Sequence, residues 1–363
     1  MTRANGTSTI EVRVSGYAGL GEGSCRVIAE AGANHNNSVE RAIEMARQAA
    51  QAGAWAIKYQ LYKADTLSVA DSPKYWDDPF GTATQYEAFK LSDRLDYGAY
   101  AEIAAACREL GIVFFATPFD LSAVEVLERI ETPLYKIASA DITHRALIEA
   151  VAATGRPVLL STGAAEIDEV HRAVEWSGLG ADRLVLLVCT LTYPTPDEDA
   201  HFARLGSFRT EFAPYLVGTS DHTLGIAGAW MTAALGGVCI EKHYTIDKRL
   251  PDVPDHAMSV EPDELAEMVA ACDRAALLRG EPSIGVRASE APARANARRS
   301  IVLERDVNAG TTLALQDLGF KRPGTGIPPF EVDRVVGMRV RSDLRRGTIL
   351  SYQDLLESAA SSI

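Results

Sequence analysis

Positive charge, cysteine and long apolar runs are all scarce in this 363-residue sequence. Its 36 lysines and arginines face 49 aspartates and glutamates, a net charge of −13, so no general positive field exists to hold a nucleic acid or an anionic membrane. The five cysteines are scattered without a CxxC pair, which argues against a disulfide framework or a structural zinc site. The N-terminus lacks the apolar segment of a signal peptide, and no stretch approaches a membrane span. We therefore expect a cytoplasmic protein with no nucleic-acid or membrane partner.

Eight short apolar runs alternate with helical segments over the first 280 residues. The runs are rich in β-branched or aromatic residues and bounded by turn residues, as buried parallel strands are. The segments 39–53 and 100–111 have helical periodicity and end in glycine. Eight such units over roughly 250 residues predict a (β/α)8 TIM barrel, whereas a doubly wound open sheet, the alternative, usually has fewer strands and a glycine-rich first turn. The expected strands are 25–32, 54–60, 112–118, 134–139, 157–163, 184–190, 216–222 and 238–245.

The barrel pattern ends at residue 280, and the rest of the chain has a different composition. Residues 281–297 are rich in proline, alanine and serine, which suits a linker. Residues 298–363 contain two similar stretches, ERDVNAGTTLALQDL and RSDLRRGTILSYQDL. This self-similarity predicts a small, β-rich, pseudo-symmetric module. Because such a module is too small for a large core of its own, we expect it to pack against another surface.

Polar residues stand at the ends of all eight expected strands. In a barrel these ends converge on one face, where the loops build the active site. Lys58 and Lys136 lie inside otherwise apolar runs, and a buried lysine is costly unless it is paired. With the neighbouring hydroxyls they predict a cradle for a phosphate or carboxylate; salt bridges to Glu30 or Asp141 are the alternative. The hydroxyl residues of this cradle are Thr117, Ser139, Ser161 and Ser220.

Two histidines, His222 and His243, end the last two expected strands, which are neighbours in a closed barrel. Two neutral imidazoles can hold one divalent metal and leave positions open for substrate. Core or capping histidines are the alternative. Because carboxylates rather than several cysteines stand nearby, Mn²⁺ is favoured over a structural zinc, with Mg²⁺ or Co²⁺ as other possibilities.

The order of the motifs resembles the sialic acid (N-acetylneuraminate) synthase family, which includes legionaminate and pseudaminate synthases. The resemblance runs from about residue 25 to the C-terminal module, which is similar to the antifreeze-like (SAF) domain of that family. The motifs, in chain order, are IAEAGANHN, KYQ, ATPFD, KIASAD, LLSTG, CTLTYPTP, TSDHTLG, EKHYT, PDHAMS and KRPGTG.

The resemblance implies a reaction and a role for each strand-end residue. Phosphoenolpyruvate would condense with the open-chain aldehyde of an N-acylhexosamine such as N-acetylmannosamine, releasing phosphate and giving a nine-carbon 2-keto-3-deoxy acid. Glu30, Lys58 and Lys136 would be catalytic, and the two lysines with the four hydroxyl residues would bind phosphoenolpyruvate. The resemblance also implies the metal at the two histidines and a homodimer whose module caps the partner's site. The implied sugar-binding residues are Gln60, Tyr193, Asp255 and Arg322.

Two segments leave the identity of the acceptor sugar undetermined. Some family members have an asparagine in the motif that here reads Cys-Thr-Leu-Thr-Tyr-Pro over 189–194, and its absence predicts altered selectivity, such as for a deaminated or differently acylated hexose. The segment 71–89 is long, aromatic and charged, and it either lines the sugar end of the site or forms a surface excursion. The alternative interpretation of Arg322 is that it is an ordinary surface arginine.

Two other functional classes remain as alternatives. A metal-dependent sugar isomerase or epimerase on the same barrel would need no lysine cradle and would release no phosphate. A sugar- or ice-binding protein built around the module would present a flat, threonine-rich face, whereas the module carries scattered arginines.

Overall fold

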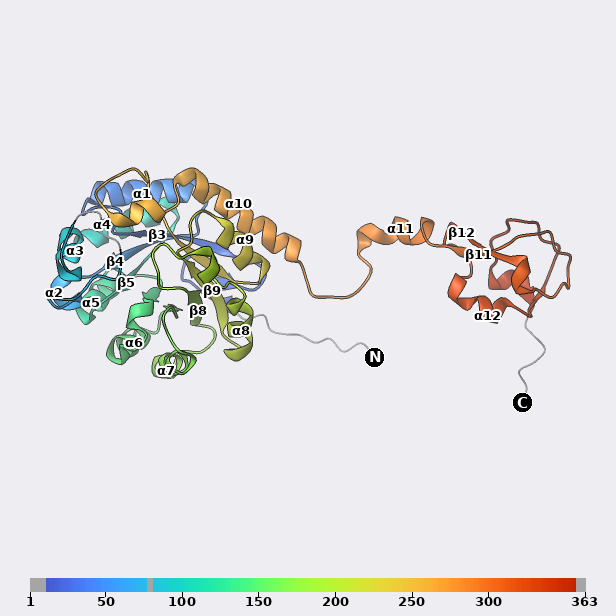
Figure 1. The fold of residues 1–363 in the computed structure, drawn as a ribbon, viewed down its shortest axis with the longest axis horizontal. Coiled ribbons are helices and arrows are strands. Elements are labelled where there is room, and N and C mark those ends of the chain that lie inside the picture. The colour runs from blue at the N-terminus through green and yellow to red at the C-terminus, as the bar shows by residue number, and fades with distance from the viewer. Residues whose placement is uncertain (1–10, 77–80, 357–363) are drawn as a thin grey trace. The chain divides into compact units, whose positions relative to one another are not determined.

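The computed structural model describes residues 11–76 and 81–356. The chain forms two compact units that divide between Gly280 and Glu281, and each is described by itself (Figure 1). Within the described ranges, no helix combines the length and the apolar character needed to cross a membrane.

Eight parallel strands of the first unit close into a barrel in chain order. The last strand pairs with the first, from Cys239 beside Arg26 to His243 beside Glu30, which confirms the (β/α)8 barrel and excludes the open sheet. All eight expected strands are present. They are β3 (Arg26–Gly32), β4 (Ala56–Leu61), β5 (Val113–Pro118), β6 (Tyr135–Ile137), β7 (Val158–Ser161), β8 (Leu184–Cys189), β9 (Leu216–Asp221) and β10 (Cys239–His243).

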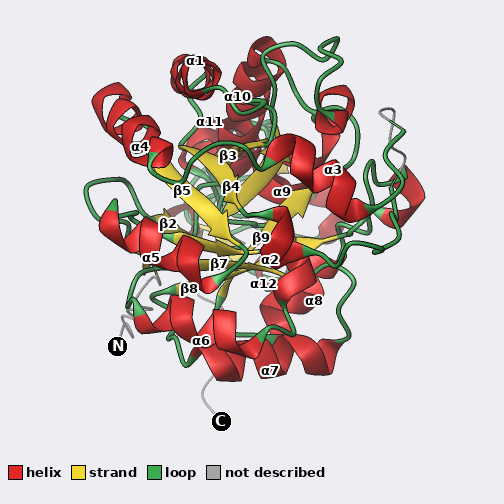
Figure 2. Cartoon of the chain, turned by 90° about the vertical axis from the view of Figure 1, so that its left-hand side faces the viewer, coloured by secondary structure: helices red, strands yellow, loops and turns green. Residues whose placement is uncertain are grey.

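Helices surround these strands (Figure 2). Side-chain caps and glycines set several of their ends: Ser38 Oγ accepts a hydrogen bond from Arg41 N (3.1 Å) at the start of α1, and Gly111 ends α4 with a φ of +73°. The helices are α1 (Val39–Gln51), α2 (Ala64–Leu67), α3 (Gln85–Ser92), α4 (Ala99–Leu110), α5 (Leu121–Arg129), α6 (Arg145–Ala153), α7 (Ile167–Ser177), α8 (Arg204–Glu211), α9 (Ala227–Ala234) and α10 (Pro262–Arg279).

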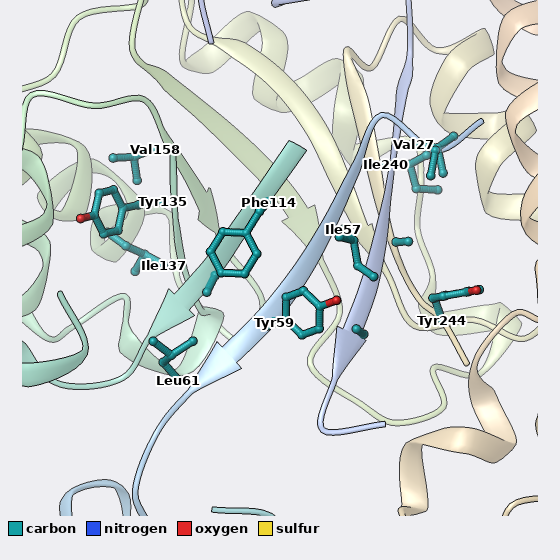
Figure 3. Close-up of a cluster of buried hydrophobic side chains, with 14 of the residues drawn as sticks. Val27, Ile57, Tyr59, Leu61, Phe114, Tyr135, Ile137, Val158, Ile240 and Tyr244 are labelled. Carbon is teal, nitrogen blue, oxygen red and sulfur yellow. The ribbon is translucent and has the colours of Figure 1, made fainter. Parts of the chain in front are cut away.

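The alternation of side chains along each strand divides the apolar residues into two cores. Residues such as Val27, Ile57 and Tyr59 face the helices and form the larger cluster (Figure 3). Ile28, one residue from Val27, belongs to a second cluster that fills the barrel interior. Most strand residues of this inner cluster lie near the strand starts, so the interior is apolar at that end.

An N-terminal hairpin closes the end of the barrel where the strands begin. Its strands are β1 (Glu11–Val12) and β2 (Leu20–Gly21), which pair antiparallel. Val12, Val14 and Leu20 are buried in the inner cluster. This hairpin is absent from the sequence-based prediction, because two-residue strands give almost no periodic signal. Its position leaves the opposite end of the barrel for a site.

The second unit has its own small core and short strands. Ile301, Leu303, Val307 and Leu350 are among the residues that form this core. The segment 281–297, expected as a linker, contains helical turns at Ala288–Glu290 and in α11. The named strands and α-helices are α11 (Ala291–Asn296), β11 (Ser300–Leu303), β12 (Leu318–Lys321), α12 (Val332–Val335), β13 (Arg339–Val340) and β14 (Leu355–Leu356).

The two similar stretches of the second unit form matching structures. The carboxylate of Asp306 accepts a hydrogen bond from Arg346 N (2.7 Å), and that of Asp343 accepts one from Ala309 N (2.8 Å). Asp306 and Asp343 occupy equivalent positions of the two stretches, and so do Ala309 and Arg346. Each aspartate thus accepts from the backbone of the other stretch at the same relative position. Each stretch also has a glycine of positive φ after its first turn and ends in a one-turn helix followed by a short strand. The module therefore has the pseudo-symmetry that its sequence predicts.

Candidate active site

The barrel interior changes from apolar to polar along each strand. In β3, Ile28 belongs to the inner apolar cluster and Glu30 lines a cavity of about 620 Å³; in β10, Cys239 and Glu241 are related in the same way. Because side chains of the same parity share a face, the last inward positions of the strands form one polar layer. Every predicted site residue of the barrel lines this cavity: Glu30, Lys58, Gln60, Thr117, Lys136, Ser139, Ser161, Tyr193, Ser220, His222, His243 and Asp255. Arg322 lies in the second unit and is exposed.

Lys58 joins two buried carboxylates across the closure of the barrel. Its Nζ lies 3.2 Å from Glu30 Oε2 and 3.3 Å from Glu241 Oε2, and it donates a hydrogen bond to Thr117 Oγ1 at 3.1 Å. All three charged side chains are at most 6% exposed. The salt bridge to Glu30 that the sequence left as an alternative is therefore present, and a second carboxylate shares it.

The two glutamates differ in acidity because their surroundings differ. Burial raises the pKa of Glu30 to about 7, although Lys58 opposes this shift. Burial acts in the same direction on Glu241, but the ammonium groups of Lys136 and Lys58 and a hydrogen bond from Ser220 Oγ (3.0 Å) hold its pKa at about 2. Neighbouring carboxyl groups with separated pKa values are the usual arrangement for an acid/base and a fixed charge.

Lys136 is buried without a carboxylate partner. Its Nζ donates to Ile137 O (3.0 Å), and no Asp or Glu oxygen of the described residues lies within 4.0 Å of it. Burial lowers its pKa. The Ser161 hydroxyl beside it is also buried without a hydrogen-bond partner among the described residues. A desolvated ammonium and a free hydroxyl at the base of a cavity are suited to an anionic ligand. The expected alternative for Lys136, a salt bridge to Asp141, does not form.

Glu241 has no role among the sequence-derived assignments, although it is one of the expected strand-end residues. The signal that identifies it is parity: Glu241 and His243 are two residues apart and face the cavity together, whereas Lys242 faces the helices. Lys242 Nζ pairs there with Asp221 Oδ2 at 2.8 Å, and both side chains are at most 2% exposed. This outward pair joins β9 to β10 directly behind the two histidines.

The two histidines lie close enough to share one ligand. Their ring centroids are 5.4 Å apart. His222 Nδ1 lies 3.0 Å from Thr190 O and donates to that carbonyl, so Nε2 carries the lone pair when the ring is neutral. Burial opposes protonation of this ring, but Cys189 and the Thr190 carbonyl raise the pKa of His222 above its usual value. Burial lowers the pKa of His243, which keeps its imidazole neutral. In residues 11–76 and 81–356, no group of three or more His, Cys, Asp or Glu side chains is placed to hold a metal ion. Two imidazole nitrogens are donors of the kind that bind divalent transition metals, whose other positions can be taken by water or substrate.

Two of the predicted sugar residues, Tyr193 and Asp255, adjoin the histidines, and a third, Gln60, adjoins Glu30. Gln60 Nε2 donates to Glu30 Oε1 (3.0 Å), the Tyr193 ring centroid is 4.3 Å from that of His222, and Asp255 Oδ2 is 3.4 Å from His243 Nδ1. Burial raises the pKa of Asp255 to about 6.

The segment 71–89 contributes to the cavity through the residues that the structure describes. Tyr75, Trp76, Gln85, Ala88 and Phe89 line it, so this part of the segment faces the site and is not a surface excursion. Residues 77–80 lie outside the described residues.

Comparison with known proteins places this geometry in a family. Residues 45–283 match the NeuB family, and residues 298–356 match the SAF domain. The chain is 35% identical to the N,N'-diacetyllegionaminic acid synthase of Legionella pneumophila, over 92% of this chain and 95% of that protein. It is 30% identical to the N-acetylneuraminate-9-phosphate synthase of Mus musculus, over 88% of this chain and 89% of that protein.

A crystal structure agrees with the sequence comparisons. The N-acetylneuraminic acid synthetase of Leptospira borgpetersenii superposes with a TM-score of 0.70 at 30% identity, covering 78% of this chain and 95% of that chain. The resemblance seen in the motifs is thereby confirmed, and the chain belongs to the NeuB family.

Proposed function

We propose that this protein condenses phosphoenolpyruvate with an open-chain N-acylhexosamine, releases phosphate, and forms a nine-carbon 2-keto-3-deoxy sugar acid. The observation that carries the proposal is the unpartnered Lys136 ammonium at the base of a cavity that also holds two acidic groups and two imidazoles. The names of the relatives from Legionella pneumophila and Mus musculus support the same class of product. An isomerase would need no cradle for a phosphate of this kind.

The anionic substrate would bind at the base of the cavity. Lys136 and the hydroxyls of Ser139, Ser161 and Ser220 would hold its phosphate, and Lys58 with Thr117 would hold its carboxylate. In this desolvated place the lysines would stabilise the charge that collects on the phosphate as its bond to carbon breaks. The three donors of the Lys58 ammonium are engaged by Glu30, Glu241 and Thr117, so its hydrogen bond to Thr117 Oγ1 would be exchanged for one to the substrate while both glutamates stay paired.

The bonds change in two stages. The C3 carbon of phosphoenolpyruvate attacks the aldehyde carbon of the sugar, which forms the new carbon–carbon bond, turns the aldehyde oxygen into a hydroxyl as it takes up a proton, and leaves a cation at C2. Water then adds to C2 and loses one proton. The C2 hydroxyl loses its remaining proton as the C2–oxygen bond to phosphate breaks, which gives the 2-keto acid and phosphate. Glu30, with a pKa of about 7 and oriented by Gln60, would accept the proton from that water. Glu241 would stay ionised and stabilise the cation.

His222 and His243 would hold a divalent metal, for which Mn²⁺ is our first choice and Mg²⁺ or Co²⁺ the alternatives. When bound, such an ion supplies a Lewis acid that polarises a carbonyl oxygen. The Thr190 carbonyl fixes the His222 ring, and the Asp221–Lys242 pair fixes the strand ends behind both rings. Tyr193 and Asp255, which contact these rings, would hold the hydroxyl or acyl groups of the sugar.

We also propose that the protein works in the cytoplasm as a homodimer in which the module of one subunit caps the site of the other. The exposed side chain of Arg322 supports this proposal, because a guanidinium over the cavity mouth can bond sugar hydroxyls and exclude water. Mixing tests it: Glu30→Gln and Arg322→Ala chains should each be nearly inactive, and co-refolded mixtures should regain about a quarter of wild-type activity. Mixtures that stay inactive after verified subunit exchange would refute capping in trans.

The function itself is tested by supplying phosphoenolpyruvate, Mn²⁺ and a panel of hexoses and N-acylated hexosamines to the full chain. Phosphate release is followed continuously, and the product is weighed by mass spectrometry. We expect equal amounts of phosphate and a product that contains the sugar plus three carbons. Interconversion of sugars without phosphate release would favour the isomerase.

A further inference from the structure

We propose that a side-chain network behind the cavity positions Asp255 for the acceptor sugar, and that His256, Asp252 and Arg41 are its positioning residues. None of these three lines the cavity. The inference rests on the proposed function, in which Asp255 holds hydroxyl or acyl groups of the sugar. The PDHAMS motif contains both Asp255 and His256, and the proposed reaction uses only the first.

Asp255 lies in a short 3₁₀ turn, Pro254–Met258, between β10 and α10. Within the described ranges no side chain caps the start of this turn, and the hydrogen bonds of a 3₁₀ turn are weaker than those of an α-helix. His256 does not line the cavity and is 1% exposed, so its ring is enclosed by protein. The turn therefore presents its other residues to the site and is anchored through His256. The residues of this stretch that line the cavity are Val253, Pro254, Asp255, Ala257 and Met258.

Both ring nitrogens of His256 have a partner. Nε2 lies 2.7 Å from Asp252 Oδ1, and Nδ1 lies 2.7 Å from Thr245 Oγ1. Burial lowers the pKa of His256, and the neutral ring satisfies both contacts by donating from Nε2 and accepting at Nδ1. Thr245 lies two residues after His243, the last residue of β10. The ring therefore ties the turn to the end of that strand.

Asp252 joins the same turn to the loop and helix that follow β3. Its Oδ2 accepts hydrogen bonds from Arg41 Nη1 (2.7 Å) and Asn36 Nδ2 (2.8 Å), while its Oδ1 accepts from His256. Burial opposes ionisation of this carboxyl group, but the three hydrogen bonds lower the pKa of Asp252. The side chains of Arg41 and Asp252 are 26% and 25% exposed, and a partly buried pair with further donors holds its geometry better than an exposed pair does.

A second contact between the two loops reaches the backbone of Asp255. Ser259 Oγ donates to Asp255 O (2.6 Å), and Asn34 Nδ2 donates to Ser259 Oγ (3.0 Å) and to Tyr244 O (2.9 Å). Asn34 and Ser259 are both buried. Because β3 and β10 are neighbours at the closure of the barrel, the loops that follow them pack together and hold the turn at two points.

The carboxylate of Asp255 depends on this support. Among the described residues none donates a hydrogen bond to it, and His243 Nδ1 lies 3.4 Å from its Oδ2. A carboxylate without donors of its own is free to accept from sugar hydroxyls, but only the backbone of its turn sets where it stands. A displacement of about 1 Å at such a contact can cost about 100-fold in rate.

The experiment measures phosphate release by the full chain with phosphoenolpyruvate, Mn²⁺ and the N-acylhexosamine that the wild-type chain uses best, N-acetylmannosamine being tried first. His256→Leu removes both ring contacts, and Asp252→Asn, which keeps the size of its side chain, serves if the first variant fails to fold. Each should lower kcat/KM for the sugar about 10- to 100-fold and leave the KM for phosphoenolpyruvate unchanged. Arg41→Met should act in the same way, and Arg41→Lys should recover part of the loss because it keeps a cation beside Asp252.

Two comparisons separate positioning from stability. Asp255→Ala should itself lower kcat/KM for the sugar, and adding His256→Leu to it should cost little more, since a positioning residue acts through the residue that it positions. Arg249→Met is the matched control, because it removes an arginine–aspartate pair from the same loop. Arg249 Nε lies 2.9 Å from Asp247 Oδ1, but the arginine side chain is 88% exposed, so the kinetics of neither substrate should change.

Equal losses for the sugar and phosphoenolpyruvate in His256→Leu, a full further loss in the double variant, or a sugar kcat/KM that matches wild type in the network variants overturns the inference while the proposed function stands. If no sugar releases phosphate, the proposed function fails, and hydrogen exchange of the substrate-free chain then decides. The Ser259 amide donates to Asp255 O (3.1 Å). Faster exchange of this amide in Asp252→Asn than in Arg249→Met supports the network, and equal exchange overturns it.

Discussion

Lys58→Met and Lys136→Met each remove one ammonium group from the same cavity, but they should differ in their effect on stability. The pKa of Lys58 is raised because its attraction to Glu241 and Glu30 outweighs the burial that opposes it. The pKa of Lys136 is lowered because burial outweighs its attraction to Glu241. A lysine with a raised pKa stabilises the fold through its charge, and one with a lowered pKa destabilises it. The fold therefore gains from the Lys58 ammonium and tolerates that of Lys136.

The magnitudes follow from the partners that each variant leaves behind. Lys58→Met leaves two buried carboxyl groups, Glu30 and Glu241, without the ammonium that they share. Breaking a buried pair in this way costs roughly 3–5 kcal/mol, and at about 2–4 °C per kcal/mol for a domain of this size Tm should fall by roughly 6–20 °C. Lys136→Met exchanges an ammonium without an ion pair for an apolar group, so Tm should stay within about 3 °C or rise.

The effect on substrate binding should be opposite to the effect on stability. Loss of the charge-assisted contact from Lys136 should weaken phosphoenolpyruvate binding about 10- to 100-fold without changing acceptor binding. Thermal unfolding without ligands gives the stability, and calorimetry with phosphoenolpyruvate gives the affinity. Arg156→Met, which removes a surface cation paired with Glu128, is the control. Equal losses of Tm in the two lysine variants, or unchanged phosphoenolpyruvate affinity in Lys136→Met, would refute the reasoning.

Three further outcomes are expected. The pH profile of kcat/KM should have an acidic limb near the Glu30 pKa of about 7, because the proton acceptor is lost below that pH. In Lys58→Met this limb should move to higher pH, because the Lys58 ammonium lowers the Glu30 pKa. A limb that stays in place in the variant contradicts the role of Glu30 as proton acceptor. His222→Ala should weaken Mn²⁺ binding at least ~10-fold by calorimetry, with Tm in EDTA as the check that the barrel remains folded. Asp317 accepts hydrogen bonds from Arg305 Nε (2.6 Å) and Ala314 N (2.9 Å), and Arg305 lowers the pKa of its carboxyl group. The stability that this carboxylate contributes is present above its unfolded pKa of about 3.9 and is lost as the pH falls through the lower folded value. Asp317→Asn should therefore destabilise the module by about 1–2 kcal/mol at pH 7 and make the Tm of the module less dependent on pH below pH 4.

The sequence by itself determined the barrel, the module and the face on which the site lies. Eight apolar runs separated by helical periodicity favour a closed barrel over the doubly wound open sheet, and polar residues at the ends of those runs then meet at one end of the barrel. The parity rule places Ile28 and Glu30 on one face, and Cys239, Glu241 and His243 on another strand of that face, before any coordinates are known. The echo between 304–318 and 341–355 likewise predicts the pseudo-symmetry of the module, since equivalent turns need equivalent glycines and aspartates.

Only the tertiary structure decided which charges meet. Lys58 was expected to bind an external anion or Glu30, and its partnership with Glu241 depends on the closure of β10 against β3, which joins residues more than half the chain apart. Lys136 donates to the Ile137 carbonyl and forms no ion pair with Asp141, and local periodicity carries no information on which of these partners it reaches. The aromatic side chains Tyr62, Phe89 and Phe119, which line the cavity, likewise come from separate stretches of chain and meet only because Phe89 and Phe119 both pack against Tyr62. Contacts of this kind are set by packing between elements, and a linear pattern records only the face that each residue occupies.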